Sequence, residues 1–254
     1  MSHVSVIVLA AGSGSRFGDA KQFLELTPGV RLVDAALQAA LSSTENVILV
    51  LPPGYSWQGH GLEVTVAGGP TRHESVAAGL AAVPVEAEVI IVHDAAHPLA
   101  PKETFTQLIG AISAGADAAV PILPVGDVVK RRNEDGRLTT VGRDGLGLAQ
   151  VPMAFTRSAL VAAYRAPATH DFPCWEDSMF IENTGGLVVS VAGSSRNIHV
   201  VTPDDLDVAR ALATQALHEA EPTSAGRASD RITMEPGTGI EPMTRCLQDS
   251  CSTD

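Results

Sequence analysis

The chain has 254 residues, of which 45% are hydrophobic and 18% charged, so it can bury a substantial core in one α/β domain. Its net charge of -12 and its pI near 5.0 argue against nonspecific binding to nucleic acid or to an anionic membrane. No apolar run approaches the roughly 20 residues of a membrane span, and the first one lacks the basic lead-in of a signal peptide. These features, together with the cysteine usage, lead us to expect a cytoplasmic protein.

A buried strand followed by a loop of small residues opens the chain. The apolar run at residues 4–9 predicts the strand, and it leads into Ala10-Ala11-Gly12-Ser13-Gly14-Ser15-Arg16. Backbone N–H groups of such a loop can close around an anion. Arg16 and Lys21 add two cations beside it. This combination predicts a site for the phosphates of a nucleoside triphosphate.

Two common phosphate-binding motifs do not fit this loop. Gly12, Gly14 and Gly18 form G-x-G-x-x-x-G, which is one residue longer than the dinucleotide-binding fingerprint. The Lys-Ser or Lys-Thr pair of the Walker A motif is also missing. An ordinary tight turn after the first strand is the remaining alternative. Because the chain has only three lysines, the position of Lys21 just after the loop favours the phosphate site.

Strand and helix patterns alternate through the first half of the chain. The predicted strands cover residues 4–9, 47–51, 64–67, 89–93 and 118–121, and the predicted helices cover 32–41, 75–82 and 104–114. This order predicts a Rossmann-like, mostly parallel sheet with helices on both faces. Ligands bind at the carboxyl ends of strands in such sheets. The loop at Gly12, the pair Gly68-Gly69 and Asp94 all follow predicted strands.

The pattern changes between residues 125 and 147. Two extended segments flank Asn133-Glu134-Asp135-Gly136, and Asp-Gly between such segments is a hairpin signal. We predict an antiparallel arm inserted into the α/β domain.

A helix at 158–164 and strands at 187–191 and 198–201 are predicted beyond the arm. Thr202 and Pro203 then open the last helix as its cap and first residue. We assign residues 1–218 to one domain. Residues 219–254 lose apolar periodicity and gain Pro, Gly, Ser and Thr, so we predict a disordered tail. The three cysteines show no metal or disulfide spacing, which favours a reducing compartment.

Several segments together resemble the 2-C-methyl-D-erythritol 4-phosphate cytidylyltransferases of the non-mevalonate isoprenoid pathway. They are Leu9-Ala10-Ala11-Gly12-Ser13-Gly14-Ser15-Arg16, Lys21-Gln22-Phe23-Leu24, Gly68-Gly69-Pro70-Thr71-Arg72-His73-Glu74-Ser75-Val76, Val92-His93-Asp94-Ala95-Ala96, residues 127–130, Ala149-Gln150-Val151-Pro152, and Asn197-Ile198 before Thr202-Pro203-Asp204-Asp205-Leu206. The first loop occurs across sugar-phosphate nucleotidyltransferases. The blocks around Arg72 and Asp94 are much more specific to the cytidylyl branch. The likeness covers residues 3–215.

The resemblance implies a Mg²⁺-dependent reaction in which CTP and an alcohol phosphate give a CDP-alcohol and pyrophosphate. It implies catalytic roles for Arg16, Lys21 and Arg143. The implied nucleotide-binding residues are Ala10, Ala11, Gly12, Ser13, Gly14, Arg16, Lys21, Gly69, Arg72, Ser75, Asp94 and Ala95. The implied acceptor-binding residues are Asp94, His97, Asp127, Arg143 and His199, and Asp94 is also the implied metal ligand.

Each of these residues also has an ordinary alternative. Lys21 and Arg16 could be surface cations, Asp94 could cap a turn, and Arg72 could only orient its loop. We expect His93 to be a neutral core histidine. The resemblance also implies a homodimer, because the family's arm crosses to a second subunit. The arm cannot bury its own apolar face, which agrees with this expectation.

The sequence departs from the family mainly on the acceptor side. His97 replaces an arginine, His199 replaces a lysine, and Val128 replaces a threonine. Trp175-Glu176-Asp177 replaces Thr-Asp-Glu, Met153 replaces a glutamine, and Ala20 replaces a proline. Arg143 is retained. The two histidine replacements remove permanent positive charge.

Three explanations stay open for these departures. The chain could use the family's acceptor with other residues substituting, or a different polyol or sugar phosphate such as ribitol 5-phosphate. It could also be a non-catalytic nucleotide-binding relative. The retained Lys21, Arg16 and Asp94 favour a working enzyme.

Overall fold

The computed structural model describes residues 3–12, 17, 20–59, 62, 64–165 and 176–220. Residues 1–220 form one compact unit. Its central eight-stranded sheet comprises β1 (Val4–Leu9), β4 (Val47–Leu51), β5 (Val64–Ala67), β6 (Val89–Asp94), β7 (Ala118–Pro124), β10 (Gly147–Ala149), β11 (Met153–Thr156) and β12 (Val188–Ala192). The helices are α1 (Leu32–Leu41), α2 (Arg72–Ala82), α3 (Lys102–Ser113), α4 (Arg157–Arg165), α5 (Ser178–Asn183) and α6 (Pro203–Ala220). The short elements are the 3₁₀ helix η1 (Lys21–Phe23) and the strands β2 (Glu25–Thr27), β3 (Val30–Arg31), β8 (Val129–Arg132) and β9 (Leu138–Val141).

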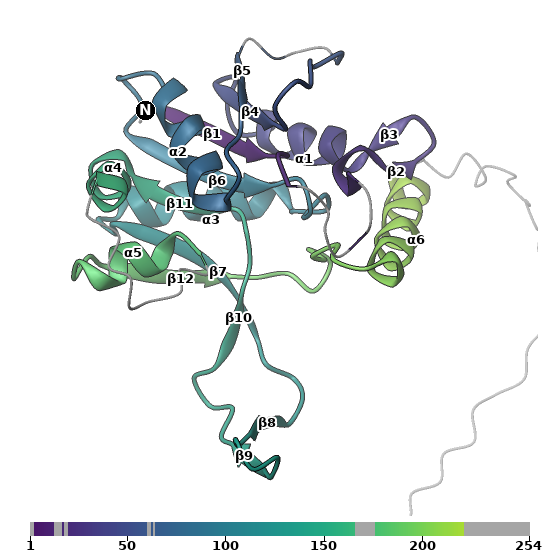
Figure 1. Ribbon diagram of the computed structural model, residues 1–254, viewed down its shortest axis with the longest axis vertical. Coiled ribbons are helices and arrows are strands. Elements are labelled where there is room, and N and C mark those ends of the chain that lie inside the picture. Colours follow the sequence, from purple (N-terminus) through teal and green to yellow (C-terminus); the bar gives the residue numbers. More distant parts are fainter. Residues whose placement is uncertain are drawn as a thin grey trace, which may run out of the picture. The chain divides into compact units, whose positions relative to one another are not determined.

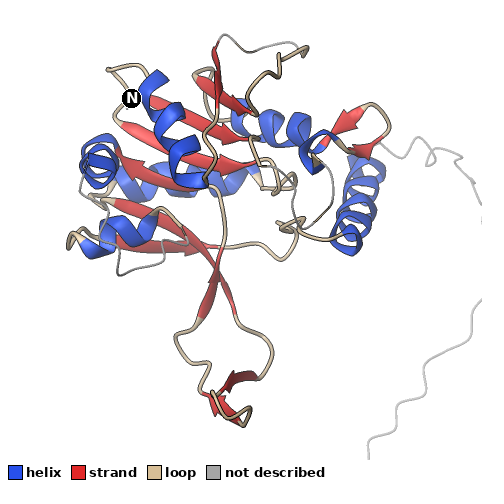
Figure 2. Ribbon diagram, in the orientation of Figure 1, coloured by secondary structure: helices blue, strands red, loops and turns tan. Residues whose placement is uncertain are grey.

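The central sheet is mostly parallel, as the sequence predicts (Figures 1 and 2). Its strand order is β10-β7-β11-β6-β1-β4-β5, and β12 pairs with β7. Strands β6, β1, β4 and β5 run parallel to one another. The exceptions are β11, which lies antiparallel between β6 and β7, and β10, which pairs antiparallel with β7. Consecutive apolar residues in β1 and β4 are buried on both faces, which explains their unbroken hydrophobic runs.

Helices cover both faces of the sheet. Val6 and Val8 of β1 point to one face, where they pack in one cluster with residues of α1 and α3. Ile7 and Leu9 point to the other face and pack in a second cluster with residues of α2, α4 and α5. The last helix, α6, packs instead with β2 in a small third cluster. No helix in the described part of the chain has the length and apolar content needed to cross a membrane.

Several predicted boundaries and one predicted strand differ from the structure. α2 begins at Arg72 rather than at residue 75, because Thr71 and Glu74 form a capping box in which each side chain accepts the other's backbone N–H. α3 covers Lys102–Ser113 rather than 104–114. The predicted strand at 198–201 was wrong: Val200 donates one backbone hydrogen bond to Ala96, but these residues join no sheet ladder.

The last helix begins as predicted and extends further than predicted. The backbone N–H of Asp205 donates to the hydroxyl of Thr202 at 3.3 Å, and the Asp205 carboxylate accepts the N–H of Thr202 at 2.7 Å. α6 then continues to Ala220, past the predicted domain boundary at 218. The remainder of the predicted tail lies outside the described residues.

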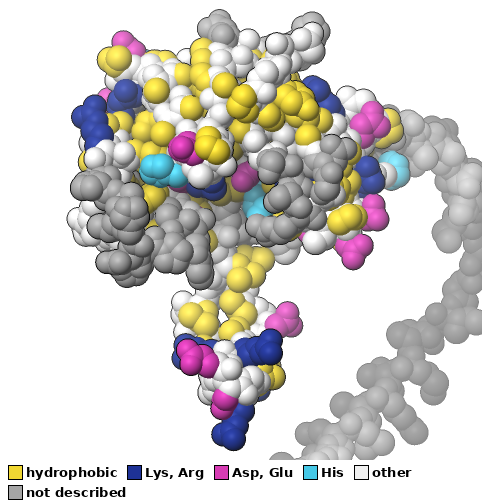
Figure 3. Space-filling model, in the orientation of Figure 1, with side chains coloured by type: hydrophobic (Ala, Val, Ile, Leu, Met, Phe, Trp, Pro, Cys, Tyr) yellow, Lys and Arg dark blue, Asp and Glu magenta, His cyan; other side chains and the backbone are white. Residues whose placement is uncertain are grey.

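An antiparallel arm stands at the predicted place and extends away from the sheet (Figure 1). β7 and β10 pair at its base, and β8 and β9 form the hairpin at its tip. Gly136 in the turn has a φ of +81°, which glycine adopts without strain. Hydrophobic side chains are visible at the base of the arm and charged ones at its tip (Figure 3). The apolar residues include Val128, Leu146 and Leu148, which are 68%, 44% and 58% exposed.

Two glycines inside helices have opposite packing and give a matched prediction. A Cβ at Gly79 of α2 would lie 2.5 Å from Cγ2 of Ile7, whereas a Cβ at Gly110 of α3 would meet nothing within 4 Å. We expect Gly79→Ala to destabilise the fold by about 1–3 kcal/mol through overpacking. We expect Gly110→Ala to stabilise it by about 0.5–1 kcal/mol through helix propensity. Urea unfolding of both variants measures this, and equal effects would contradict the close packing of α2 on β1.

Candidate active site

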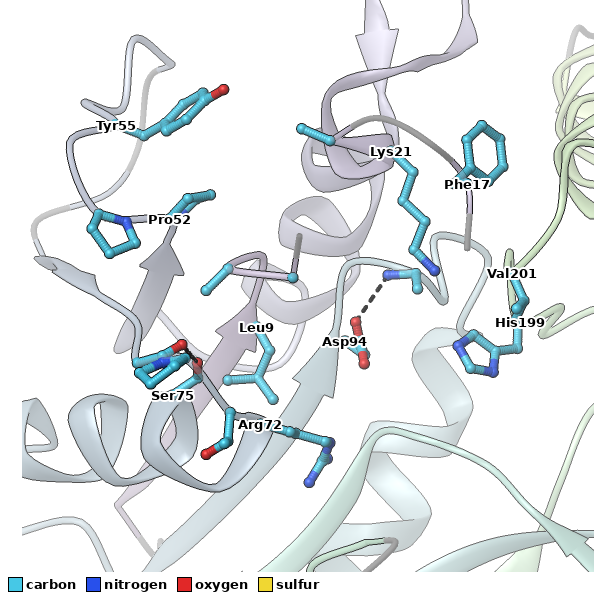
Figure 4. A pocket seen from close by; sticks show the side chains of 18 residues that line it. Leu9, Phe17, Lys21, Pro52, Tyr55, Arg72, Ser75, Asp94, His199 and Val201 are labelled. Atoms are coloured by element: carbon cyan, nitrogen blue, oxygen red, sulfur yellow. Dashed lines mark hydrogen bonds between the residues drawn. The ribbon is translucent and has the colours of Figure 1, made fainter. Parts of the chain in front are cut away.

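A cavity of about 840 Å³ opens at the carboxyl ends of four neighbouring strands (Figure 4). Leu9 ends β1, Pro52 follows β4, Gly69 follows β5, and Asp94 ends β6. These strands run parallel, so the loops after them meet at one edge of the sheet. Several predicted site residues therefore come together here although they are far apart in the sequence.

Glycine allows the loops after β1 and β5 to approach each other. A Cβ at Gly68 would lie 2.4 Å from Cβ of Ala11 and 2.8 Å from Oγ of Ser75. A Cβ at Gly69 would lie 2.3 Å from Cβ of Glu74. Gly12 differs, because a Cβ there would meet nothing within 4 Å. Gly68 and Gly69 thus serve the packing of the protein itself, while Gly12 leaves open space beside the cavity.

Ser75, which lies in α2, holds the loop after β5 in place. Its side chain is buried, and its hydroxyl donates to the carbonyl oxygen of Gly69 at 3.3 Å. Thr71 and Arg72 line the cavity just before it. The first turn of α2 therefore faces the cavity, and the partial positive charge of a helix N-terminus favours an anion there.

Lys21 reaches into the cavity from η1 (Figure 4). Its ammonium group donates to the carbonyl oxygen of Val200 at 2.5 Å. The backbone N–H of Val200 in turn donates to the carbonyl oxygen of Ala96 at 2.8 Å. These bonds tie η1, the loop after β6 and the segment before α6 into one wall of the cavity.

Asp94 stands at the end of β6 with its carboxylate in the cavity (Figure 4). One oxygen, Oδ1, accepts the backbone N–H of Ala96 at 3.1 Å. This hydrogen bond shapes the turn after the strand and orients the carboxylate. Asp94 can therefore hold this turn and still offer its carboxylate to a ligand in the cavity.

Arg72 lines the cavity and is held by a buried acid. Its Nη1 lies 2.7 Å from Oδ2 of Asp177, whose side chain is 1% exposed. Burial by itself lowers the pKa of the Arg72 guanidinium, but the charge and hydrogen bond of Asp177, with smaller help from Asp94, raise it above its usual value. Arg72 thus presents a permanent positive charge at the cavity.

Two histidine rings stack where the segment before α6 borders the cavity. The ring centroids of His97 and His199 are 4.5 Å apart with an interplanar angle of 18°. His199 is exposed and lines the cavity, whereas His97 is buried behind it. Burial, followed by the neighbouring His199, lowers the pKa of His97 to about 4. His97 is therefore neutral at pH 7.

Comparison with known proteins identifies the family. The family model of the 2-C-methyl-D-erythritol 4-phosphate cytidylyltransferases matches residues 4–215. The chain belongs to this family. A relative of that name from Chromobacterium violaceum is 36% identical over 218 residues, which cover 81% of this chain and 96% of the relative. One from Carboxydothermus hydrogenoformans is 31% identical over 228 residues, covering 85% and 97%.

Solved structures and longer relatives agree with this membership. The crystal structure of the cytidylyltransferase from Thermus thermophilus superposes with a TM-score of 0.72 at 31% identity, covering 84% of this chain and 99% of that one. The "Bifunctional enzyme IspD/IspF" of Solidesulfovibrio magneticus is 36% identical over 220 residues. This match covers 79% of the present chain and 54% of that enzyme. The chain thus spans about half the length of these bifunctional relatives.

Some residues implied by the cytidylyltransferase resemblance do not reach the cavity. Ala10 and Ala95 pack in the core, and their N–H groups donate to Val50 and Leu9. Their side chains and these N–H groups are thus engaged within the protein, and their roles toward a nucleotide stay predictions. His97 packs behind His199 and does not line the cavity, and its role toward an acceptor stays a prediction.

The arm residues are also separate from the cavity of their own chain. Asp127 and Arg143 lie on the arm, outside the cavity lining. The guanidinium of Arg143 donates to the carbonyl oxygen of Gly126 at the base of the arm. Their roles toward an acceptor stay predictions. Ser13, Gly14 and Arg16 lie outside the described residues.

Other lining residues were missed by the sequence analysis. They are Leu9, Phe17, Ala20, Pro52, Pro53, Tyr55, Pro70, Thr71, Ala96 and Val201. The position of Pro52 and Pro53 after a predicted strand was a usable signal. Tyr55 gave none, because its place depends on stacking against Phe23, with the ring centroids 5.0 Å apart.

His93 is fully buried, as expected for a core histidine, and gives a pH-dependent prediction. Burial lowers its pKa to about 3, and neither ring nitrogen has a hydrogen-bond partner among the described residues. Below about pH 6.5 the unfolded chain binds a proton there that the folded chain does not, so stability falls by about 1.4 kcal/mol per pH unit.

We therefore expect His93→Leu to reduce the loss of stability on acidification. Urea unfolding of wild type and variant at pH 7.5 and 5.0, without metal, measures the effect. The same acid sensitivity in both proteins would contradict the buried, neutral state of His93.

Proposed function

We propose that this chain transfers CMP from CTP to 2-C-methyl-D-erythritol 4-phosphate and releases pyrophosphate. The observation that carries the proposal is the meeting of Lys21, Arg72 and Asp94 around one cavity in a member of this family. The glycine-containing loops after β1 and β5 form another wall of that cavity. Cations, a carboxylate and close backbone suit a nucleoside triphosphate.

The proposed reaction requires positioning more than covalent help from the protein. An oxygen of the acceptor phosphate attacks the α-phosphorus of CTP, a new P–O bond forms, and the bond to the β-phosphate breaks as pyrophosphate leaves. Negative charge gathers on the reacting phosphoryl group and on the leaving group. Lys21 and Arg72 would stabilise this charge, and the two loops would hold the nucleotide in line.

Magnesium belongs to the proposal as the ion bound with the triphosphate. Mg²⁺ commonly binds one or two protein carboxylates and takes its other ligands from phosphates and water. Asp94 fits this pattern, because its carboxylate lines the cavity and is oriented by the N–H of Ala96. Within the described residues, no group of three His, Cys, Asp or Glu side chains could hold a metal ion by itself. When bound, the ion would neutralise part of the triphosphate charge.

A homodimer formed through the arm is a further part of the proposal. Val128, Leu138 and Leu148 of the arm are 68%, 64% and 58% exposed, and a two-stranded arm cannot bury them alone. A second copy could cover these side chains and receive Asp127 and Arg143 near its own cavity. Light scattering should give the mass of a dimer, and a monomer at micromolar concentration would contradict this part. We also propose a cytoplasmic location, which rests on the cysteine pattern.

The two histidines favour a second candidate acceptor. His97 and His199 stand where the family carries an arginine and a lysine, and His97 is neutral at pH 7. A site with less permanent charge could accept another polyol or sugar phosphate, such as ribitol 5-phosphate. The same nucleotide chemistry would then serve a different acceptor.

Pyrophosphate release from CTP and Mg²⁺ tests the proposal across a panel of acceptors. The panel contains methylerythritol phosphate, ribitol phosphate, other sugar phosphates and no acceptor. We expect turnover with methylerythritol phosphate above the acceptor-free rate. Turnover only with another acceptor would support the second candidate. CTP binding without turnover would support a non-catalytic nucleotide-binding protein.

A further inference from the structure

A buried carboxylate behind the cavity wall pairs with Arg72. Asp177 precedes α5, its side chain is 1% exposed, and it lies 105 residues from Arg72 in the sequence. Asp177 does not line the cavity, but its partner Arg72 does. Asp177 can therefore position a ligand in the cavity only through Arg72.

Both oxygens of this carboxylate accept a hydrogen bond from a different element. Oδ2 accepts from Nη1 of Arg72 at 2.7 Å, and Oδ1 accepts from the hydroxyl of Tyr164 at 2.5 Å. Arg72 begins α2, and Tyr164 lies near the end of α4. The carboxylate is thus oriented from two sides.

The tyrosine is itself fixed by aromatic contacts. Its ring stacks on His73 of α2 with centroids 4.4 Å apart and an interplanar angle of 3°. It also meets the ring of Phe180 of α5 edge to face at 5.6 Å. Contacts among α2, α4 and α5 therefore determine where Asp177 stands.

The guanidinium that Asp177 holds extends along the cavity. The Arg72 side chain is 33% exposed and runs from α2 toward the side where Asp94 lies (Figure 4). A guanidinium has five N–H donors in a rigid planar fork, so fixing one nitrogen orients the others. A phosphate oxygen in the cavity would meet a charge that is already in place.

We infer that Asp177 is a positioning residue that holds Arg72 toward the polyphosphate of the nucleotide, with Tyr164 holding Asp177 in turn. The inference deepens the proposed function and rests on it for the identity of CTP as the ligand. Arg72 touches the ligand, whereas Asp177 and Tyr164 act only through Arg72.

Charge and positioning predict opposite effects for Asp177→Asn. Removing a negative charge near a site for a polyanion should by itself tighten binding of CTP. Weakening the hydrogen bond that holds Arg72 should instead loosen it, because a neutral amide oxygen accepts less strongly than a carboxylate. The sign of the change therefore separates the two roles.

The test measures the dissociation constant of CTP with Mg²⁺ by calorimetry on the full chain. The variants are Asp177→Asn, Arg72→Gln, the double variant and Tyr164→Phe. Asp207→Asn is the matched control, because Asp207 also pairs with an arginine, Arg210 at 3.3 Å, but lies on α6 outside the cavity. Thermal unfolding accompanies each titration. Arg72→Gln leaves a buried carboxylate without its cation, so we expect it to melt below the double variant.

We expect Asp177→Asn to weaken CTP binding about tenfold and Tyr164→Phe to weaken it about threefold. In the Arg72→Gln background, Asp177→Asn should cause no further weakening. The control should bind like the wild type.

Three results would overturn the inference alone. One is tighter CTP binding by Asp177→Asn, and another is wild-type affinity in that variant. The third is an equal loss from Asp177→Asn with and without Arg72, which indicates a general structural role. A wild-type chain that binds no CTP would overturn the proposed function and this inference with it.

Discussion

Replacing Lys21 by alanine is expected to lower kcat/KM for pyrophosphate release by about 10²- to 10³-fold, the usual effect of losing one preorganised donor to developing charge. Lys21 lines the cavity and is held there by its bond to the carbonyl oxygen of Val200. The lost hydrogen bond should also lower the free energy of unfolding, by about 1–2 kcal/mol. Steady-state kinetics and urea unfolding measure the two effects separately.

Lys102→Ala is the matched control for this result. Lys102 is one of the three lysines, begins α3 and lies outside the cavity lining. Its variant should retain wild-type turnover. Near-wild-type turnover in Lys21→Ala would contradict the role of Lys21 at the reacting phosphates. A large loss of stability there would indicate that the lysine serves mainly to join η1 to the segment before α6.

Replacing Asp94 by asparagine is expected to lower kcat by about 10²-fold and to raise the Mg²⁺ concentration needed for half-maximal rate. The amide oxygen of asparagine can still accept the N–H of Ala96, so the turn after β6 should persist. The substitution therefore removes the negative charge with little change in the fold, and we expect it to weaken Mg²⁺ binding. Rates measured across a magnesium titration test both expectations.

Asp135→Asn provides a control with the same local geometry. Oδ1 of Asp135 accepts the N–H of Arg137 at 3.0 Å, as Asp94 accepts that of Ala96, but this turn lies on the arm. Unchanged magnesium dependence is expected for this control. If Asp94→Asn also retains the wild-type magnesium dependence, Asp94 does not bind the ion.

The parallel strands and their helices could be predicted because buried strands have a direct sequence signal. Residues 4–9 and 47–51 are apolar without interruption apart from Ser5, since both faces of these strands are covered. β11 was missed, because Met153–Thr156 is short and its antiparallel place between β6 and β7 depends on long-range pairing. The segment 198–201 looked like a strand, but the backbone bond from Val200 to Ala96 joins it to the cavity wall and to no sheet ladder.

The cavity could be predicted in part, because most of its chemistry follows strand ends. Gly12, Gly69 and Asp94 lie at or just after strand ends and line it as expected. Sequence could not show that Ala10 and Ala95 face the core. The backbone conformation of each turn residue determines where its side chain points, and the sequence pattern does not give that conformation. The partnership of Arg72 with Asp177 depends on the packing of α5 and α4 against α2 and has no local signal.

The paired histidines illustrate the same limit. Compared with the family pattern, the sequence has histidine in place of two permanent cations on the acceptor side, at His97 and His199. Only the structure shows that the two rings stack and that His97 lies behind His199. His199 lines the cavity, whereas His97 is buried and does not line it.

The most direct measurement is phosphorus NMR of the purified chain with CTP, Mg²⁺ and 2-C-methyl-D-erythritol 4-phosphate. The account predicts that CTP and the acceptor disappear together while a cytidine diphosphate ester and pyrophosphate appear in equal amounts. Unchanged CTP, or CTP consumed without incorporation of the acceptor, would contradict cytidylyl transfer to this substrate.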